Sequence, residues 1–140
     1  MRGTALHNAA LALAISAVAA TGPAAGETFI TFQVSGHDTY AYAINAGGAV
    51  AGSYGSGISH GHVRAADGTI TTFDPEGSSD TFPLSINRKG AVTGYYSGSQ
   101  YSGFLRKPRG KIISFDPSGS YGTFSFAIND SGVITGPWED

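Results

Sequence analysis

Hydrophobic residues alternate with small or polar residues over short stretches that recur along most of the chain. Val92, Gly94 and Tyr96 stand two residues apart, and the same spacing returns at 50–54 and 134–138. A period of two places such residues on one face of an extended strand. Segments rich in Gly, Asn, Asp and Pro separate these stretches and are typical of turns. The pattern therefore predicts short strands joined by turns, and an all-β domain.

The chain also repeats itself at an offset of 42 residues, without gaps. Residues 43–84 and 85–126 are identical at 18 of 42 positions. A partial unit follows at 127–140, and 27–42 resemble the end of a unit with one residue deleted. A fixed period of this length is the signature of tandem supersecondary units. Each whole unit contains four predicted strands, which in the second copy are residues 81–87, 91–96, 101–107 and 111–115.

The most repeated polar residues have a structural explanation. Asn45, Asn87 and Asn129 each begin a four-residue segment that a glycine closes, and an asparagine side chain can accept a hydrogen bond from the backbone two residues on. Asp74 and Asp116 begin Asp-Pro-x-Gly segments, the pattern of a type I turn. We therefore expect these five residues to make turns rather than to take part in catalysis.

The motifs of the unit keep one order: Ile-Asn, Gly-x-Val-x-Gly-x-Tyr, Gly-x-x-Arg, Gly-x-Ile and Phe-Asp-Pro-x-Gly-Ser. In this order and spacing they resemble the HAF family of bacterial extracellular repeats, from about Phe32 to Trp138. The resemblance implies an exported protein built from tandem units of roughly forty residues, folded as blades of a β-propeller. It implies no activity common to the family.

The number of strands bears on how such a fold closes. One strand at 28–34, four in each whole unit and two at the end make eleven predicted strands. Propellers close with about four to eight four-stranded blades, so one chain is too short for an ordinary ring. Either the N-terminal strand completes the last unit, or several copies pool blades into a symmetric homo-oligomer that covers the exposed strand edges. A threefold β-trefoil or β-prism is the monomeric alternative.

Composition changes this picture mainly by exclusion. The chain has 140 residues, 41% of them hydrophobic, which is enough for a buried core. Its net charge of −2 offers no basic field to attract nucleic acid. The absence of cysteine excludes disulfides, thiolate metal sites and a cysteine nucleophile. Nothing in the pattern predicts a cofactor.

The first 26 residues have the features of a signal peptide. Arg2 precedes an apolar run from Ala9 to Ala20, which is shorter than the about 20 residues of a transmembrane helix and fits a signal h-region. Small residues offer cleavage sites between about residues 19 and 26. We therefore expect a secreted or periplasmic protein, with residues 27–140 as its β-repeat domain and no membrane anchor after cleavage.

Two histidines on one predicted strand are the sharpest candidates for chemistry. His60 and His62 lie two residues apart and face the same side, so they could share a metal ion, with His37 or Asp38 as further ligands. The alternative is that both are ordinary half-buried strand residues, since Phe104 stands at the position equivalent to His62. A metal-assisted hydrolase is the alternative function on the first interpretation. The sequence offers no nucleophile elbow and no predicted catalytic residue.

Aromatic and arginine residues favour a binding surface. Tyr95, Tyr101 and Tyr121 have no aromatic counterpart in the first unit, so we expect them at the surface, where flat rings can stack on sugars. Arg64 and Arg106 recur on the third strand, where each can hold an anion or bridge blades, and we expect bridging. The sequence thus predicts an exported, non-catalytic repeat protein that binds a glycan or a protein.

Overall fold

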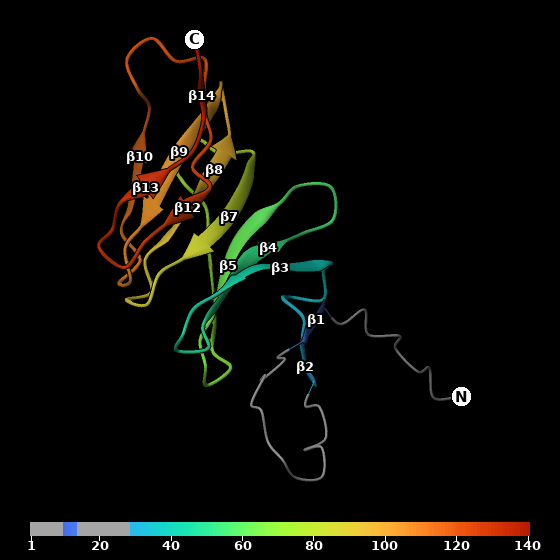
Figure 1. Cartoon of the computed structure of the whole chain (residues 1–140). Helices are drawn as coiled ribbons and strands as arrows, with labels where there is room; N and C mark the ends of the chain where they lie inside the picture. The colour runs from blue at the N-terminus through green and yellow to red at the C-terminus, as the bar shows by residue number, and fades with distance from the viewer. Residues whose placement is uncertain (1–9, 14–28) are drawn as a thin grey trace.

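In a computed structural model, residues 10–13 and 29–140 are described, and every regular element within them is a β-strand (Figure 1). The predicted all-β class is confirmed. The predicted signal peptide lies outside the described residues except for four residues of β1. The strands are β1 (Ala10–Leu13), β2 (Phe29–Phe32), β3 (Thr39–Ile44), β4 (Val50–Tyr54), β5 (His60–Arg64), β6 (Ile70–Phe73), β7 (Asp80–Ile86), β8 (Val92–Ser97), β9 (Tyr101–Arg106), β10 (Ile112–Phe115), β11 (Gly122–Thr123), β12 (Ala127–Ile128), β13 (Ile134–Thr135) and β14 (Trp138–Glu139).

β1 pairs with β2 in an antiparallel sheet of two strands, and the later strands fall into three sets. The first strand set is β3–β6, a four-stranded sheet in sequence order. The second is β7–β10, in which β9 pairs with both β8 and β10. The third is β11–β14, in which β11 pairs with β14 and β12 with β13. A single parallel pair, Gly122 with Tyr101, joins the third set to the second.

The pairing within the three sets has the same register 42 residues apart. The bulge between Ala41 and Ala43 returns between Pro83 and Ser85. Corresponding pairs at the far end of the first hairpin are Thr39 with Tyr54, Thr81 with Tyr96, and Thr123 with Trp138. Equal spacing of turns and bulges produces this register, because hairpin turns set which residues face each other.

A glycine in the second strand of each set allows a close approach of the first strand. A Cβ atom at Gly94 would overlap the carbonyl oxygen of Phe82, and one at Gly52 would overlap that of Tyr40. The bulged first strand therefore comes too near for any side chain at this position. This close approach is the reason for the small residue between two large ones in the sequence.

The core lies where the first and second sets pack together. Ala51, Ile86, Val92 and Phe104 are its fully or nearly fully buried members, and β4 lies against β7. β1 and β2 lie at one end of the molecule and β8–β10 and β12–β14 at the other, with β3–β5 between them (Figure 1). The described residues form neither a closed propeller nor a closed barrel.

Candidate functional site

The three repeated asparagines hold turns and connect successive strand sets. The Oδ1 atom of Asn87 accepts hydrogen bonds from the backbone N–H groups of Lys89 at 3.1 Å and Ala91 at 2.9 Å. Asn45 and Asn129 each make the corresponding pair of bonds. The amide of Asn45 also donates to the carbonyl of Asn87 at 3.0 Å, and that of Asn87 to the carbonyl of Asn129 at 3.1 Å. These side chains are committed to backbone groups and are not available for catalysis.

The turn aspartates contact the third strand of their own set. The Asp74 carboxylate accepts a hydrogen bond from the Thr81 hydroxyl at 2.6 Å and lies 2.7 Å from Nδ1 of His60. In the second set Asp116 accepts a bond from the Ser102 hydroxyl at 2.8 Å instead. Position 60 and position 102 are equivalent, so His60 takes a structural place that a serine fills in the next set.

The second histidine of the predicted metal pair is an interior residue. His62 has no exposed surface, and its ring packs edge-on against Phe32 at 5.7 Å and Tyr54 at 6.4 Å between centroids. Neither ring nitrogen has a hydrogen-bond partner, and burial lowers its pKa to about 4. His62 is therefore a neutral, packed side chain at neutral pH.

The additional ligands expected for a metal do not gather around this pair. His37 places Nδ1 3.3 Å from the Ser56 hydroxyl, and it lies with Tyr54 and His60 along a hollow of about 370 Å³. Over residues 10–13 and 29–140, no group of three or more His, Asp or Glu side chains is arranged to hold a metal ion. The arrangement does not favour metal-assisted hydrolysis.

Both candidate arginines lie between strand sets. The guanidinium carbon of Arg106 is 5.0 Å from the centre of the Phe73 ring, and that of Arg64 is 5.4 Å from the Phe32 ring. Arg106 is 7% exposed and its Nε has no partner, so burial lowers its pKa. Cation–π stacking gives Arg106 a neighbour in the preceding strand set and Arg64 a neighbour on β2, and both are bridging positions rather than open anion sites.

Two of the three candidate tyrosines belong to a group of aromatic rings, the aromatic cluster, formed by Phe82, Tyr95, Tyr101 and Phe124. The Tyr95 ring lies 5.1 Å from Phe82, 5.9 Å from Tyr101 and 5.0 Å from Phe124, and Tyr101 lies 5.1 Å from Phe124. Burial, with Tyr101 and Tyr42 nearby, raises the pKa of Tyr95. Tyr101 is 45% exposed, so the cluster opens to solvent there. Tyr121, 77% exposed, has no ring in contact among the described residues.

Sequence reasoning missed the two phenylalanines of the cluster, and also Tyr40 and Tyr42. The rings of Tyr40 and Tyr42 stack at 6.4 Å on β3, and both are about half exposed. The available signal was the repeat: Tyr40, Phe82 and Phe124 stand 42 residues apart, so each first strand carries an aromatic residue at the same position.

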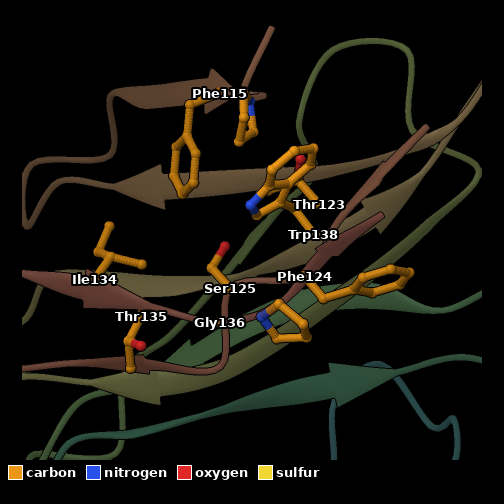
Figure 2. Close-up of a pocket in the computed structure, with 10 residues that line it drawn as sticks. Phe115, Thr123, Phe124, Ser125, Ile134, Thr135, Gly136 and Trp138 are labelled. Carbon is orange, nitrogen blue, oxygen red and sulfur yellow. The ribbon is translucent and has the colours of Figure 1, made fainter. Parts of the chain in front are cut away.

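A second hollow, of about 240 Å³, lies beside the third strand set. Figure 2 shows the rings of Phe115 and Trp138 above the Ser125 side chain, with Ile134 to their left. Its remaining lining residues are Pro117, Thr123, Phe124, Thr135, Gly136 and Pro137. The lining thus combines the end of β10 with residues 123–125 and 134–138.

Comparison with known proteins adds no family to this description. Neither a family model, nor a curated protein, nor a solved structure matches the chain. Over residues 10–13 and 29–140 there is also no helix long and apolar enough to cross a membrane.

Proposed function

We propose that the chain is an exported, non-catalytic binding protein whose propeller-like strand sets hold an aromatic surface for a glycan. The observation that carries the proposal is the aromatic cluster. Four rings from β7, β8, β9 and the segment after β11 contact one another, with centroids 5.0 to 5.9 Å apart, and the Tyr101 ring is half exposed.

Rigid aromatic rings of this kind suit the apolar faces of sugars. A tyrosine has an apolar ring and a polar hydroxyl, so it can stack on a pyranose and also hydrogen-bond to it. Packing among neighbouring rings fixes their rotamers, which reduces the entropy that binding would otherwise cost. No charged side chain belongs to the cluster, and this favours a neutral glycan over an anionic one.

The propeller-like arrangement is supported by the packing between sets. Arg106 of the second set stacks on Phe73 of the first, and Arg64 of the first set stacks on Phe32 of β2. Asn45 and Asn87 each donate to the turn of the following set. Identical junctions repeated along a chain generate a ring or a solenoid. Because the same junctions place Tyr95 against Phe124 of the third set, the aromatic cluster depends on this arrangement.

Export is proposed from residues 1–26 and is tested separately. Expression in a bacterial host followed by N-terminal sequencing of the extracytoplasmic protein should give a start between about residues 20 and 27. Retention of residues 1–26 on a cytoplasmic protein would contradict export without bearing on glycan binding.

The binding test is native electrophoresis in gels that contain soluble neutral polysaccharides. We expect at least one polysaccharide to retard the wild-type protein and the Tyr101→Ala variant to lose that retardation. Tyr121→Ala is the matched control, because Tyr121 is more exposed than Tyr101 and lies outside the cluster. Equal retardation of the two variants, or none of the wild type across a broad panel, would overturn the proposal.

A further inference from the structure

The first strand set carries two tyrosines outside the aromatic cluster, here called the tyrosine pair. Tyr40 and Tyr42 both lie on β3, and both are about half exposed. Their ring planes differ by 9°, and the ring centroids are 6.4 Å apart. The β-bulge between Ala41 and Ala43 leaves Tyr42 without a partner residue in the register with β4, and its ring lies beside that of Tyr40. Two parallel rings therefore stand together at the surface of one strand.

A hydrogen bond to a buried side chain fixes the position of one ring of the pair. Ser53 on β4 is buried, and its hydroxyl donates to the hydroxyl oxygen of Tyr42 at 3.1 Å. A phenolic hydroxyl that accepts one hydrogen bond still has its own proton to donate. Tyr42 thus combines an ordered ring with a donor for a ligand hydroxyl, and a side chain held in this way loses less entropy on binding.

The tyrosine pair is close to the aromatic cluster of the second and third sets. β3 lies against β7, the strand that carries Phe82. Burial raises the pKa of Tyr95, and the neighbouring hydroxyls of Tyr101 and Tyr42 raise it further. The Tyr42 hydroxyl therefore lies within electrostatic range of the cluster.

The register of the hairpins places these rings on equivalent faces of successive sets. Tyr40 pairs with Ser53 in the first set, and Phe82 pairs with Tyr95 in the second, in each case 42 residues apart. We call the combined surface the aromatic band, and its members are Tyr40, Tyr42, Phe82, Tyr95, Tyr101 and Phe124. The band thus draws its rings from three strand sets.

The chemistry of the band fits a chain of sugars better than a single one. A monosaccharide has room to stack on one ring, whereas a linear glycan can contact rings from more than one set. All six side chains are uncharged and four of them carry a hydroxyl. This combination suits a ligand with apolar ring faces and hydroxyl groups but no charge.

We propose that the tyrosine pair is a second subsite of the glycan-binding surface, and that the ligand is a linear neutral glycan lying along the aromatic band from β3 to Tyr101. The inference rests on the function proposed above, and it adds a ligand length and two residues to it. Contact with the second subsite is intramolecular once the first is occupied, so the affinity of the protein increases with glycan length.

The probe is a series of oligosaccharides of increasing length, prepared from the polysaccharide that most retards the wild-type protein in native gels. Titration calorimetry gives the dissociation constant for each length. From the shortest oligosaccharide that binds to the longest, we expect the affinity of the wild type to rise by about tenfold or more, and then to level off.

Variants of the pair separate the two subsites. Tyr40→Ala and Tyr42→Ala should each lose most of the gain with length, while their affinity for the shortest oligosaccharide stays within about twofold of the wild type. Tyr42→Phe keeps the ring and should retain most of the gain. Tyr101→Ala should weaken binding at every length.

Tyr121→Ala is the matched control, because it removes an exposed tyrosine outside the band. Its affinities should follow those of the wild type at every length. Urea midpoints of all variants show that they are folded. If Tyr42→Ala unfolds, Tyr40→Ala and the length series of the wild type still decide the question.

Three results would overturn the inference. One is a wild-type affinity that does not change with glycan length. Another is a full gain with length in both Tyr40→Ala and Tyr42→Ala. The third is a homodimer in light scattering that Tyr42→Ala dissociates and the glycan does not, because a second copy would then cover the pair.

Failure of this inference can be distinguished from failure of the proposed function. If Tyr101→Ala loses binding while the variants of the tyrosine pair behave as the wild type, only the second subsite is wrong. If no polysaccharide retards the wild type, the glycan-binding function is wrong and the second subsite with it.

Discussion

The second and third strand sets have equivalent residues and the same register, but they differ in strand length and in burial. Val92 on β8 has no exposed surface, whereas Ile134, its counterpart on β13, is partly exposed. β7 is one strand of seven residues, whereas the equivalent stretch of the third set is divided into β11 and β12, of two residues each. The hairpins have the same register.

The difference shows that a neighbouring strand, rather than the hairpin's own sequence, makes these strands long and buried. β9 pairs with the whole length of β8, and the Phe104 ring of β9 is part of the core. An isolated two-stranded hairpin is only marginally stable in water, and a third strand supplies both hydrogen bonds and apolar cover. Among the described residues no third strand pairs with β13 or β14, and these strands are shorter and more exposed than β8.

The largest expected effect comes from removing the buried ring on the third strand of the second set. Phe104→Ala leaves a cavity beneath a fully buried side chain and should lower the free energy of unfolding by about 3–5 kcal/mol. Phe126→Ala, in the half-exposed third set, is the control and should cost less than about 1 kcal/mol. Urea unfolding followed by circular dichroism measures both. Similar losses for the two variants would contradict the contrast between the sets.

The next effect uses acid, because the first set has His62 where the second has Phe104. The pKa of His62 is about 4 in the folded protein and the usual value, 6.5, when unfolded. Between these two pH values the unfolded chain therefore binds more protons than the folded protein. The contribution of the buried neutral His62 to the free energy of unfolding is fully retained at neutral pH and is lost as the pH falls from about 6.5 to 4. The total loss is on the order of 3 kcal/mol.

The His62→Phe variant should lack most of that pH dependence. Its free energy of unfolding at pH 4.5 should stay closer to its value at pH 7 than that of the wild type does. The measurement is urea unfolding at the two pH values, with His37→Phe as control for an exposed histidine. An unchanged slope with pH in His62→Phe would rule out His62 as the source.

Alanine substitutions at Asn87 and Asn129 should measure the hydrogen bond between strand sets, because Asn87 makes that bond in addition to the two turn bonds that both residues make. Asn87→Ala removes two bonds to its own turn and one to the carbonyl of Asn129, and should cost about 2–3 kcal/mol. Asn129→Ala removes the two turn bonds alone, at an exposed position, and should cost about 1 kcal/mol less. Thermal unfolding of the two variants measures the difference. Equal costs would show that the bond between sets contributes nothing.

The smallest effect comes from removing the arginine cation that stacks between the first and second strand sets. Arg106→Met keeps much of the side-chain volume but removes the cation over Phe73, and should cost about 1 kcal/mol. Arg109→Met, in the exposed turn after β9, is the matched control and should be neutral within about 0.5 kcal/mol. Chemical unfolding of both variants gives the comparison. A stabilised Arg106→Met would mean that the cost of burying the cation exceeds its stacking energy.

Local pattern was sufficient to locate the strands of the second set. The predicted ranges 81–87, 91–96, 101–107 and 111–115 differ from β7–β10 by no more than one residue at either end. Alternation and turn residues are both local, so they act within a few residues of chain. The same pattern predicted two strands at the end of the chain, where the structure has four short ones. Pairing with a third strand is not a local property.

The candidate sites were less accessible from sequence than the strands. Spacing placed His60 and His62 on the same strand face, but it did not show that Asp74 engages the first or that aromatic rings enclose the second. The aromatic cluster joins Phe82, Tyr95 and Phe124, which come from two strand sets. Contacts between sets depend on how the sheets pack, and no single-strand pattern reports that packing.

The sequence by itself determined the 42-residue period, the strand and turn positions, and the alternation that sends Val92 and Tyr96 to one face, because each follows from local sterics and hydrogen bonding. The tertiary structure alone decided which faces and edges are covered. Phe73 is covered by Phe104 and Arg106, whereas the equivalent Phe115 lines an open hollow. Burial depends on the neighbour that packs against a residue. Identical residues in successive strand sets are therefore covered in one set and exposed in the next.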